Sequence, residues 1–297
     1  MPTPRGGGLA ITSLTIVGFV AFATWWHAFP WQDVAGFTTA ALVIGVTSLI
    51  DDVRSLSACV RFFAHALSAL IATSTCGYVS AIAFADGSVY LGVIGAVLTL
   101  VWIVGLTNAY NFMDGIDGIA GGQALVAGAG WAILGARANE PAFLAIGALI
   151  AATSLGFLAH NWAPAHIFMG DVGSAFLGFS FATLPLLAQP DKGRFIVPAA
   201  LFVWPFLFDT TLTFIRRLYR RENAFAAHRS HLYQRLNIAG YSHNWISTLY
   251  ILLAIGGAAA AIAFPYTGIS IQLGLIAVVL GMALALWRFV LRVERSR

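Results

Sequence analysis

Ten apolar segments dominate this chain and restrict what it can fold into. Each is about long enough to cross the ~30 Å hydrocarbon core of a bilayer as a helix, and only the seventh is short. A window of about 19 residues places them at residues 9–26, 34–50, 60–80, 89–106, 116–136, 142–159, 173–187, 195–215, 244–264 and 268–290. The pattern predicts an all-α polytopic membrane protein with about ten transmembrane helices, organised as one domain over residues 1–297.

The composition agrees with a membrane protein. Of the 297 residues, 59% are hydrophobic and 9% are charged, whereas soluble domains contain about 25% charged residues. Cys59 and Cys76 fall near opposite ends of one apolar segment, so they cannot form a disulfide with each other. The net charge of +4 could indicate nucleic-acid binding. Because the cations follow the loops between segments, we interpret them as a topology signal and expect no nucleic-acid partner.

The distribution of Lys and Arg predicts the orientation of the chain. With the N-terminus in the cytoplasm, thirteen of the sixteen fall on the cytoplasmic side, and only Arg137, Lys192 and Arg194 fall outside. Polar clusters then lie in the cytoplasmic connections, at about residues 51–59, 107–115, 160–172 and 216–243. The outer connections are short and carry no such cluster.

The first segment has an alternative interpretation as a signal peptide. Arg5 precedes an apolar run, and Ala21-Phe22-Ala23 resembles a cleavage site. Cleavage there would discard the glycine-rich stretch PTPRGGG. We therefore expect the segment to be retained.

Aspartates at the ends of apolar segments require an explanation, because an ionised residue deep in a membrane helix costs roughly 2.5–3.5 kcal/mol on insertion scales. In the predicted topology six lie at or toward the cytoplasmic ends: Asp51, Asp52, Asp114, Asp117, Asp171 and Asp209. Carboxylates gathered at one level repel each other unless a cation lies among them. A hard divalent cation fits, so we expect Mg²⁺, with Mn²⁺ as the alternative.

Each acid also has a structural interpretation. Asp51 and Asp52 could end a helix at the water interface, although acids there oppose the helix dipole. Asp209 could pair with Arg216, one helical face along. Helix N-caps are the alternative for three others: Asp114, Asp117 and Asp171.

Basic residues lie at the same predicted level: Arg5, Arg54, Arg61, Arg216, Arg217, Arg220, Arg221 and Arg229, with His228 and His231. Guanidinium groups suit phosphate oxygens, and histidines can donate to a phosphate or relay a proton. Glycines in GGG, DGIDG and MGDVGS let the backbone approach an anion. Alternatively, His228 and His231 could be exposed loop residues, and the arginines at residues 216–221 could serve only to keep this loop in the cytoplasm. Together these groups indicate phosphate chemistry on a substrate that is partly lipid.

Five motifs carry a family resemblance: PTPRGGGLAI, IDDVRSL, NAYNFMDGIDGIAGG, HIFMGDVGSAFLGF and AHRSHLYQRL. From Pro2 to about Gly240, the chain resembles the polyprenyl-phosphate N-acetylhexosamine-1-phosphate transferases, glycosyltransferase family 4. The resemblance implies transfer of a sugar 1-phosphate from a UDP-linked N-acetylated sugar to undecaprenyl phosphate, with release of UMP. It also implies a bacterial inner-membrane enzyme with a cytoplasmic active site, which initiates a cell-surface polysaccharide; a homodimer is left open.

The resemblance also assigns expected roles to residues. Asp171 is expected to hold Mg²⁺, together with Asp114, and Asp51 and Asp52 to lie near the lipid phosphate as a base or a further metal contact. The expected catalytic residues are Asp51, Asp52, Asp114, Asp117, His228 and His231. The expected substrate-binding residues are Asn108, Asn111, Arg54, Arg61 and Arg229.

Two departures from the family pattern stand out. Relatives usually have another span before the PTPRGGG stretch, whereas Met1 directly precedes it here, and the histidine loop is only H-x-x-H. The rival function is a secondary transporter for an anionic solute. Transporters place their binding groups near the bilayer midplane, so the clustering of polar groups toward one face favours the transferase.

Overall fold

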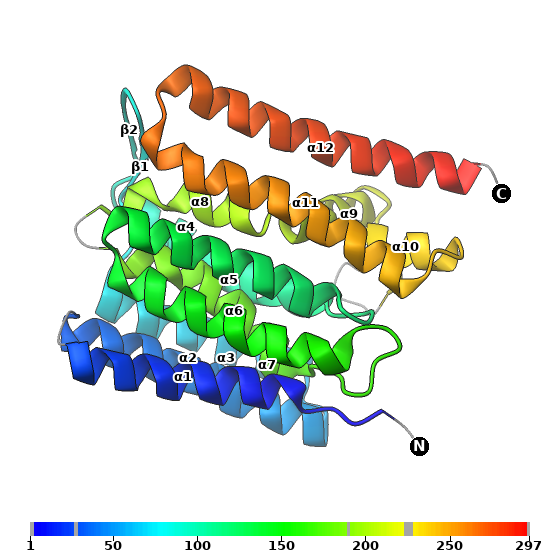
Figure 1. Ribbon diagram of the computed structural model, residues 1–297, viewed down its shortest axis with the longest axis horizontal. Coiled ribbons are helices and arrows are strands. Elements are labelled where there is room, and N and C mark those ends of the chain that lie inside the picture. Colours follow the sequence, from blue (N-terminus) through cyan, green and yellow to red (C-terminus); the bar gives the residue numbers. More distant parts are fainter. Residues whose placement is uncertain (1–2, 27–28, 189–190, 223–227, 296–297) are drawn as a thin grey trace.

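The computed structural model describes residues 3–26, 29–188, 191–222 and 228–295. Figure 1 shows a bundle of helices that run roughly side by side, with both ends of the chain at the same end of the bundle. Its helices are α1 (Gly7–Trp26), α2 (Trp31–Arg54), α3 (Ala58–Cys76), α4 (Ile94–Phe112), α5 (Ile119–Ala138), α6 (Pro141–Asn161), α7 (Asp171–Thr183), α8 (Ile196–Phe202), α9 (Trp204–Tyr219), α10 (Leu232–Ile238), α11 (His243–Ala263) and α12 (Ile269–Arg295).

The predicted fold class is confirmed. Among the described residues, eight helices are long and apolar enough to cross a membrane, or nine if a bent pair is counted as one span. The seventh predicted segment is short, as expected: α7 continues through a 3₁₀ turn, η1 (Leu184–Leu187), to make an apolar helix over Asp171–Leu187.

The eighth segment differs from the prediction of one straight span. It is broken between α8 and α9, which are bent by 76° relative to each other with the short turn η2 (Lys192–Arg194) before α8. Pro205 lies in the first turn of α9. Proline lacks the N–H that would continue the preceding helix and is tolerated only in a first turn, so the break falls just before it.

A β-hairpin at the opposite end of the bundle from the termini was not predicted (Figure 1). Strands β1 (Ala81–Phe84) and β2 (Gly87–Tyr90) pair antiparallel, with Ala81 opposite Tyr90. The fourth apolar segment was therefore predicted to start too early, because α4 begins only at Ile94. The two-residue connection between the strands fits a tight hairpin, whose short strands are hard to separate from the start of an apolar helix by pattern alone.

Helix α7 lies in the centre of the bundle and positions the polar residues described below. Every residue from Val172 to Thr183 is buried, and α7 packs against α1, α2 and α4. Only its first residue, Asp171, is partly accessible. The neighbouring α5 and α6 approach closely because both present glycines: a Cβ at Gly147 would lie 2.6 Å from the Ala132 nitrogen.

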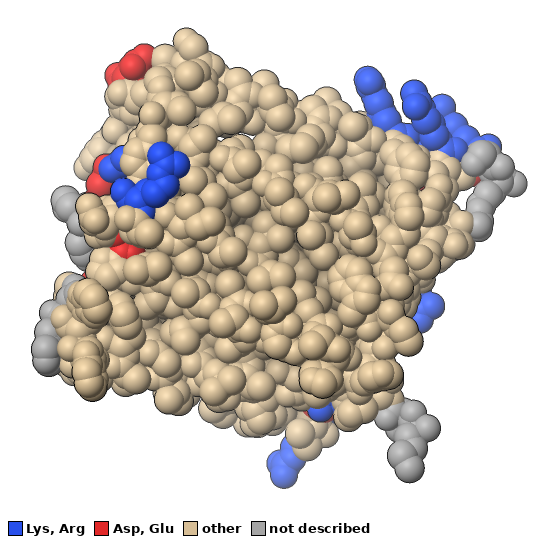
Figure 2. Space-filling view, viewed as in Figure 1, with Lys and Arg blue, Asp and Glu red and all other residues tan. Residues whose placement is uncertain are grey.

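Charged side chains gather at the two ends of the bundle, and the surface between them is almost free of charge on the face shown in Figure 2. Such a band is typical of a surface that faces hydrocarbon. The two cysteines are free, with Cys59 exposed and Cys76 buried at the other end of α3, as their spacing predicted.

Candidate active site

Two acids from distant parts of the sequence meet where α7 begins. The Asp52 carboxylate accepts the backbone N–H of Asp171 at 3.0 Å and that of Val172 at 3.1 Å. The first amides of a helix have no intrahelical partner and favour an anion. Gly170 makes the approach feasible: its φ is +76°, and a Cβ there would lie 2.8 Å from Asp52 Oδ2. Asp52 thus fixes the start of α7 from α2.

Arg61 lies between two of the predicted acids. Its Nη1 is 3.2 Å from Asp51 Oδ2 and 3.7 Å from Asp171 Oδ2. Asp51 is only 7% exposed and also accepts the Leu56 N–H. A buried carboxylate is unfavourable unless it is paired, so Arg61 and the Leu56 amide account for the burial of Asp51.

Asn111 orients the side chain of Asp171. Its Nδ2 donates to Asp171 Oδ1 at 3.0 Å and to Ser174 Oγ at 3.0 Å, and Ser174 in turn donates to the Gly170 carbonyl at 3.1 Å. The Asp171 side chain is still 37% exposed. Sequence reasoning missed Ser174, although it lies within the quoted MGDVGS motif, one helical turn after Gly170.

Asp114 lies close enough to Asp171 and Asp52 for their negative charges to act on its carboxyl group. Burial, and then the negative charges of Asp171 and Asp52, raise the pKa of Asp114 to about 7. Carboxylates that shift each other in this way mark a place where a cation is favourable. The predicted convergence of acids from separate segments is therefore confirmed for Asp51, Asp52, Asp114 and Asp171.

The expected Mg²⁺ would need oxygen donors from this group of acids. Among the described residues, no three His, Cys, Asp or Glu side chains are arranged to hold a metal ion. Asp52 is engaged by two amides and Asp51 by Arg61, whereas Asp171, which accepts from Asn111 and faces Arg61, is still partly exposed. Mg²⁺ commonly takes one or two carboxylates and completes its shell with water and substrate phosphates. Asp171, whose carboxylate is exposed, therefore fits one ligand position of Mg²⁺, and Asp114 as a second ligand stays a prediction.

The histidine loop is organised by Asp209, which is fully buried in α9. Asp209 accepts the N–H of Leu232 and that of Tyr233 at the start of α10, and its Oδ1 lies 3.3 Å from His231 Nδ1. The alternative interpretation, in which Asp209 pairs with Arg216, does not hold, because Arg216 donates instead to the Ser230 carbonyl. The free backbone amides at the start of a helix favour a carboxylate such as that of Asp209.

The other histidine, His228, lies beside His231, with ring centroids 4.9 Å apart. Its Nδ1 is 3.0 Å from Ser230 Oγ. Partial burial, followed by the nearby His231 and the arginines of α9, lowers the pKa of His228. This shift favours the neutral form of the imidazole.

Helix α10 rests on the connection between α4 and α5. The Tyr233 hydroxyl donates to the Phe112 carbonyl at 3.1 Å. A Cβ at Gly115 would overlap that hydroxyl, so glycine is required there for α10 to dock. The His231 ring also contacts Phe112, with centroids 6.4 Å apart. The histidine loop and the loop that carries Asp114 are thus in direct contact.

The recorded contacts of Asp117 lie outside the group of Asp51, Asp52, Asp114 and Asp171. Its Oδ2 accepts the Ala165 N–H at 3.2 Å and lies 3.3 Å from His243 Nδ1, and its carbonyl accepts the Ser247 hydroxyl at 2.6 Å. Gly118 follows with φ +79° and begins α5, so the turn directs Asp117 toward α11. These contacts engage the Asp117 side chain away from the other acids, and its expected catalytic role stays a prediction.

Three other residues with predicted substrate-binding roles have no recorded contact with the acids among the described residues. The Asn108 amide donates to the Val104 carbonyl of its own helix at 2.7 Å, one turn from Asn111. Arg54 and Arg229 are exposed, and neither forms an ion pair among the described residues. Their expected substrate-binding roles stay predictions.

The N-terminal glycines form one wall beside α7. The N–H groups of Gly6 and Gly7 donate to the Phe168 carbonyl at 3.2 and 3.0 Å, and that of Gly8 donates to the Met169 carbonyl at 2.9 Å. A Cβ at Gly8 would overlap the backbone of Gly173. Residues 4–8 are therefore part of the folded structure around Asp171.

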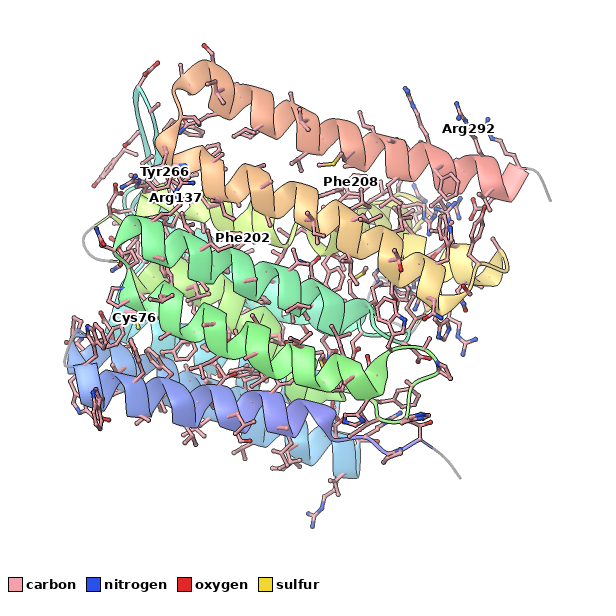
Figure 3. All side chains as sticks on the ribbon, in the orientation of Figure 1. Cys76, Arg137, Phe202, Phe208, Tyr266 and Arg292 are labelled. Atoms are coloured by element: carbon pink, nitrogen blue, oxygen red, sulfur yellow. The ribbon has the colours of Figure 1, made fainter. Side chains whose placement is uncertain are left out.

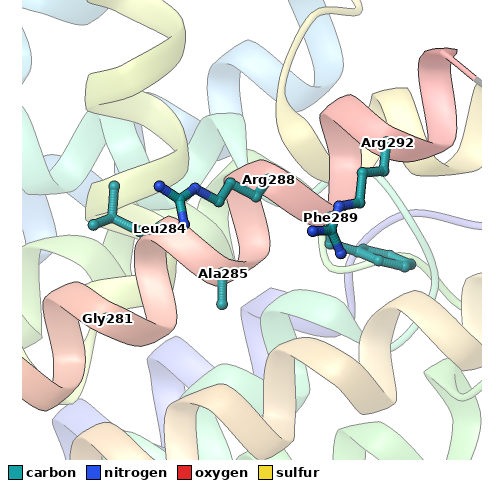
Figure 4. A pocket seen from close by; sticks show the side chains of 6 residues that line it. All are labelled: Gly281, Leu284, Ala285, Arg288, Phe289 and Arg292. Carbon is teal, nitrogen blue, oxygen red and sulfur yellow. The ribbon is translucent and has the colours of Figure 1, made fainter.

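Two cavities lie away from these residues. One of about 380 Å³ is a groove on α12 lined by Gly281, Leu284, Ala285, Arg288, Phe289 and Arg292 (Figure 4). The other, of about 220 Å³, lies near the hairpin. Figure 3 places Arg292 toward the end that holds the termini, and Arg137 and Tyr266 at the opposite end. Asp171, by contrast, lies at the end of the bundle where α1 begins, because residues 6–8 pair with Phe168 and Met169.

A polytopic helical membrane protein with acids, an arginine and histidines gathered at one end is the class that this fold and site define. The profile of glycosyl transferase family 4 matches residues 34–189, which include α2 through α7 and the four converging acids. The chain belongs to glycosyl transferase family 4.

Three relatives illustrate the similarity. A probable undecaprenyl-phosphate N-acetylglucosaminyl 1-phosphate transferase of Bacillus subtilis is 34% identical over 255 residues, covering 84% of this chain and 70% of the relative. A decaprenyl-phosphate N-acetylglucosaminephosphotransferase of Mycobacterium tuberculosis is 31% identical over 322 residues, covering 95% and 78%. A phospho-N-acetylmuramoyl-pentapeptide-transferase of Latilactobacillus sakei is 38% identical over 102 residues, covering 34% and 32%.

Proposed function

We propose that this protein transfers a sugar 1-phosphate of the N-acetylhexosamine type from a UDP-sugar to undecaprenyl phosphate. The products are the undecaprenyl-diphospho-sugar and UMP, and the reaction begins a cell-surface polysaccharide. The observation that carries the proposal is Asp171, held at the start of α7 by the Asp52 cap, Asn111 and Arg61. Family membership and the names of the relatives support the same reaction class.

Electrostatics explains why the reaction needs this arrangement. In the proposed reaction an oxygen of the lipid phosphate forms a bond to the β-phosphorus, and the bond from that phosphorus to UMP breaks. Both reactants are anions, so their repulsion must be offset before attack. Mg²⁺ held by Asp171 and Asp114 supplies positive charge to the pyrophosphate when it is bound. Arg61 adds a fixed cation, and Asn111 holds the Asp171 carboxylate in place.

The proposed location is the bacterial inner membrane, with the site facing the cytoplasm, where UDP-sugars are made. The positive-inside distribution supports this orientation, because thirteen of sixteen Lys and Arg residues belong to that side. Gathering of the polar groups at one end of the bundle favours a transferase over a transporter with a midplane site.

The proposal is tested by incubating the purified protein with Mg²⁺, undecaprenyl phosphate and a panel of UDP-sugars, and measuring UMP. We expect UMP release with at least one UDP-N-acetylhexosamine, dependence on the lipid phosphate, and loss of activity with EDTA that Mg²⁺ or Mn²⁺ restores. Solute uptake by reconstituted vesicles without UMP release would instead support the transporter. UMP release that is insensitive to EDTA would contradict the metal assignment.

A further inference from the structure

Asp209 is a buried carboxylate that joins three helices near the histidine loop. It lies on α9, has no exposed surface, and accepts the N–H of Leu232 at 2.7 Å and of Tyr233 at 3.2 Å from α10. It also accepts the Tyr250 hydroxyl of α11 at 2.6 Å and the Thr213 hydroxyl at 3.3 Å. Every side of the carboxylate is therefore engaged by a donor.

These donors restrain the residue that precedes α10. His231 is only 4% exposed, and its Nδ1 lies 3.3 Å from Asp209 Oδ1. The next two backbone amides are bound to the same carboxylate, and the His231 N–H itself donates to Gln234 Oε1 at 3.2 Å. The backbone that follows the imidazole is therefore fixed relative to Asp209, and Nδ1 faces the same carboxylate without a hydrogen bond to it.

Tyr233 extends this restraint to the loop that carries Asp114. Tyr233, whose amide binds Asp209, donates its hydroxyl to the Phe112 carbonyl, two residues before Asp114. Gly115, directly after Asp114, leaves the space that this hydroxyl occupies. One carboxylate thus connects the position of His231 with the position of the Asp114 loop.

We propose that Asp209 is a positioning residue that holds His231 and the Asp114 loop in a fixed relation, so that both meet one substrate. This inference rests on the transferase reaction proposed above. Burial of a charged carboxylate is unfavourable unless several donors compensate it. An apolar side chain would pack there without that cost, but it could not order the start of α10.

Hydrogen exchange tests the positioning independently of catalysis. In Asp209→Asn the charge and one acceptor are lost, so we expect faster amide exchange in residues 228–238 and also in residues 112–118. In Tyr233→Phe only residues 112–118 should exchange faster, because the amides of α10 keep their acceptor. The control is Tyr90→Phe, which removes a hydroxyl from the exposed hairpin at the other end and should change neither region.

Kinetics then tests the functional consequence. We expect Asp209→Asn to lower kcat by about 10- to 100-fold, the range found when a partner that orients an active-site ligand is removed, with KM changed less than about 3-fold. If Asp209→Asn does not fold, Tyr250→Phe serves as the second variant, because it keeps the carboxylate and removes one donor. It should show the same two effects at smaller size.

Two results would overturn the inference. One is unchanged exchange in residues 228–238 in a folded Asp209→Asn protein. The other is faster exchange there with normal kcat, which would make Asp209 a purely structural residue. If the wild-type protein releases no UMP, the proposed function fails, whereas the exchange measurements still decide whether Asp209 orders both regions.

Discussion

The Asp52 carboxylate of α2 caps the helix that begins at Asp171, with its two oxygens 3.0 and 3.1 Å from the amides of Asp171 and Val172. The residue that the sequence assigns to the lipid phosphate is therefore also the residue that sets the position of the expected metal ligand. A substitution at Asp52 should act on stability and on the reaction together.

Asp52→Asn keeps the shape of the side chain but leaves only one oxygen to accept the two amides. We expect it to lower the free energy of unfolding by about 1–2 kcal/mol, as for loss of a helix cap, and to lower the rate of UMP release. Thermal unfolding in detergent, measured beside activity, checks both. Asp86→Asn, in the exposed hairpin, is the matched control. Normal stability with lost activity would show a chemical role without the capping role.

Gly170→Ala should disturb the same contact, between Asp52 and the start of α7, by changing the residue that precedes the helix. The new Cβ would lie 2.8 Å from Asp52 Oδ2, and φ +76° is unfavourable for alanine. We expect a loss of about 1–3 kcal/mol in stability and reduced activity. Gly156→Ala is the control, since that glycine lies within helix α6 and has open space around it. If both variants unfold at the same temperature, the close approach at Gly170 is unimportant.

Comparing Arg61→Gln with Arg54→Gln tests the roles of two predicted substrate-binding arginines. Arg61→Gln removes the partner of the buried Asp51 and a cation beside Asp171, so we expect kcat/KM to fall by about 100-fold. Arg54→Gln removes the same charge from an exposed position with no ion pair among the described residues, and we expect less than about a 5-fold change, as for other screened surface charges. Steady-state kinetics on the lipid and the UDP-sugar measures both. Equal losses would indicate a general charge effect.

Glu140, between α5 and α6, should make stability depend on pH. Burial raises the pKa of Glu140 to about 7, although Arg194 and Lys192 oppose the shift. The folded protein therefore holds this proton more tightly than the unfolded chain does. The resulting stability is present below about pH 4.5 and is lost as the pH rises through 7. We expect Tm to fall between pH 5 and 8 less in Glu140→Gln than in the wild type; parallel curves would contradict this.

Much of the fold could be predicted from the sequence, because hydrophobic length alone marks membrane helices. The positions of α1 and α2 follow directly from their apolar runs. The break before α9 could not be predicted from hydropathy, since Pro205 interrupts hydrogen bonding and not apolar character. The hairpin before α4 was missed because four-residue strands resemble the start of an apolar run.

The site was predicted in part for a similar reason. Depth in the membrane could be predicted from the position of each acid at a segment end, which is why Asp52 and Asp171 were expected to meet. The direction in which each side chain points could not be predicted, because it depends on the turn between helices. Asp114 faces the cluster, whereas Asp117, three residues on, pairs with His243. Apart from Thr213 in its own helix, the recorded partners of Asp209 lie at the start of α10 and on α11, and nothing in the sequence of α9 indicates them.

The most direct test of the account is UMP release by Asp171→Asn, which keeps the shape of the side chain and removes its charge. The substitution is made in the purified protein, with Mg²⁺, undecaprenyl phosphate and the preferred UDP-sugar, and folding is confirmed by an unchanged Tm. We predict that UMP release falls to background, because the cation then loses its exposed carboxylate. Near-normal turnover would contradict the assignment of Asp171 and with it the proposed site.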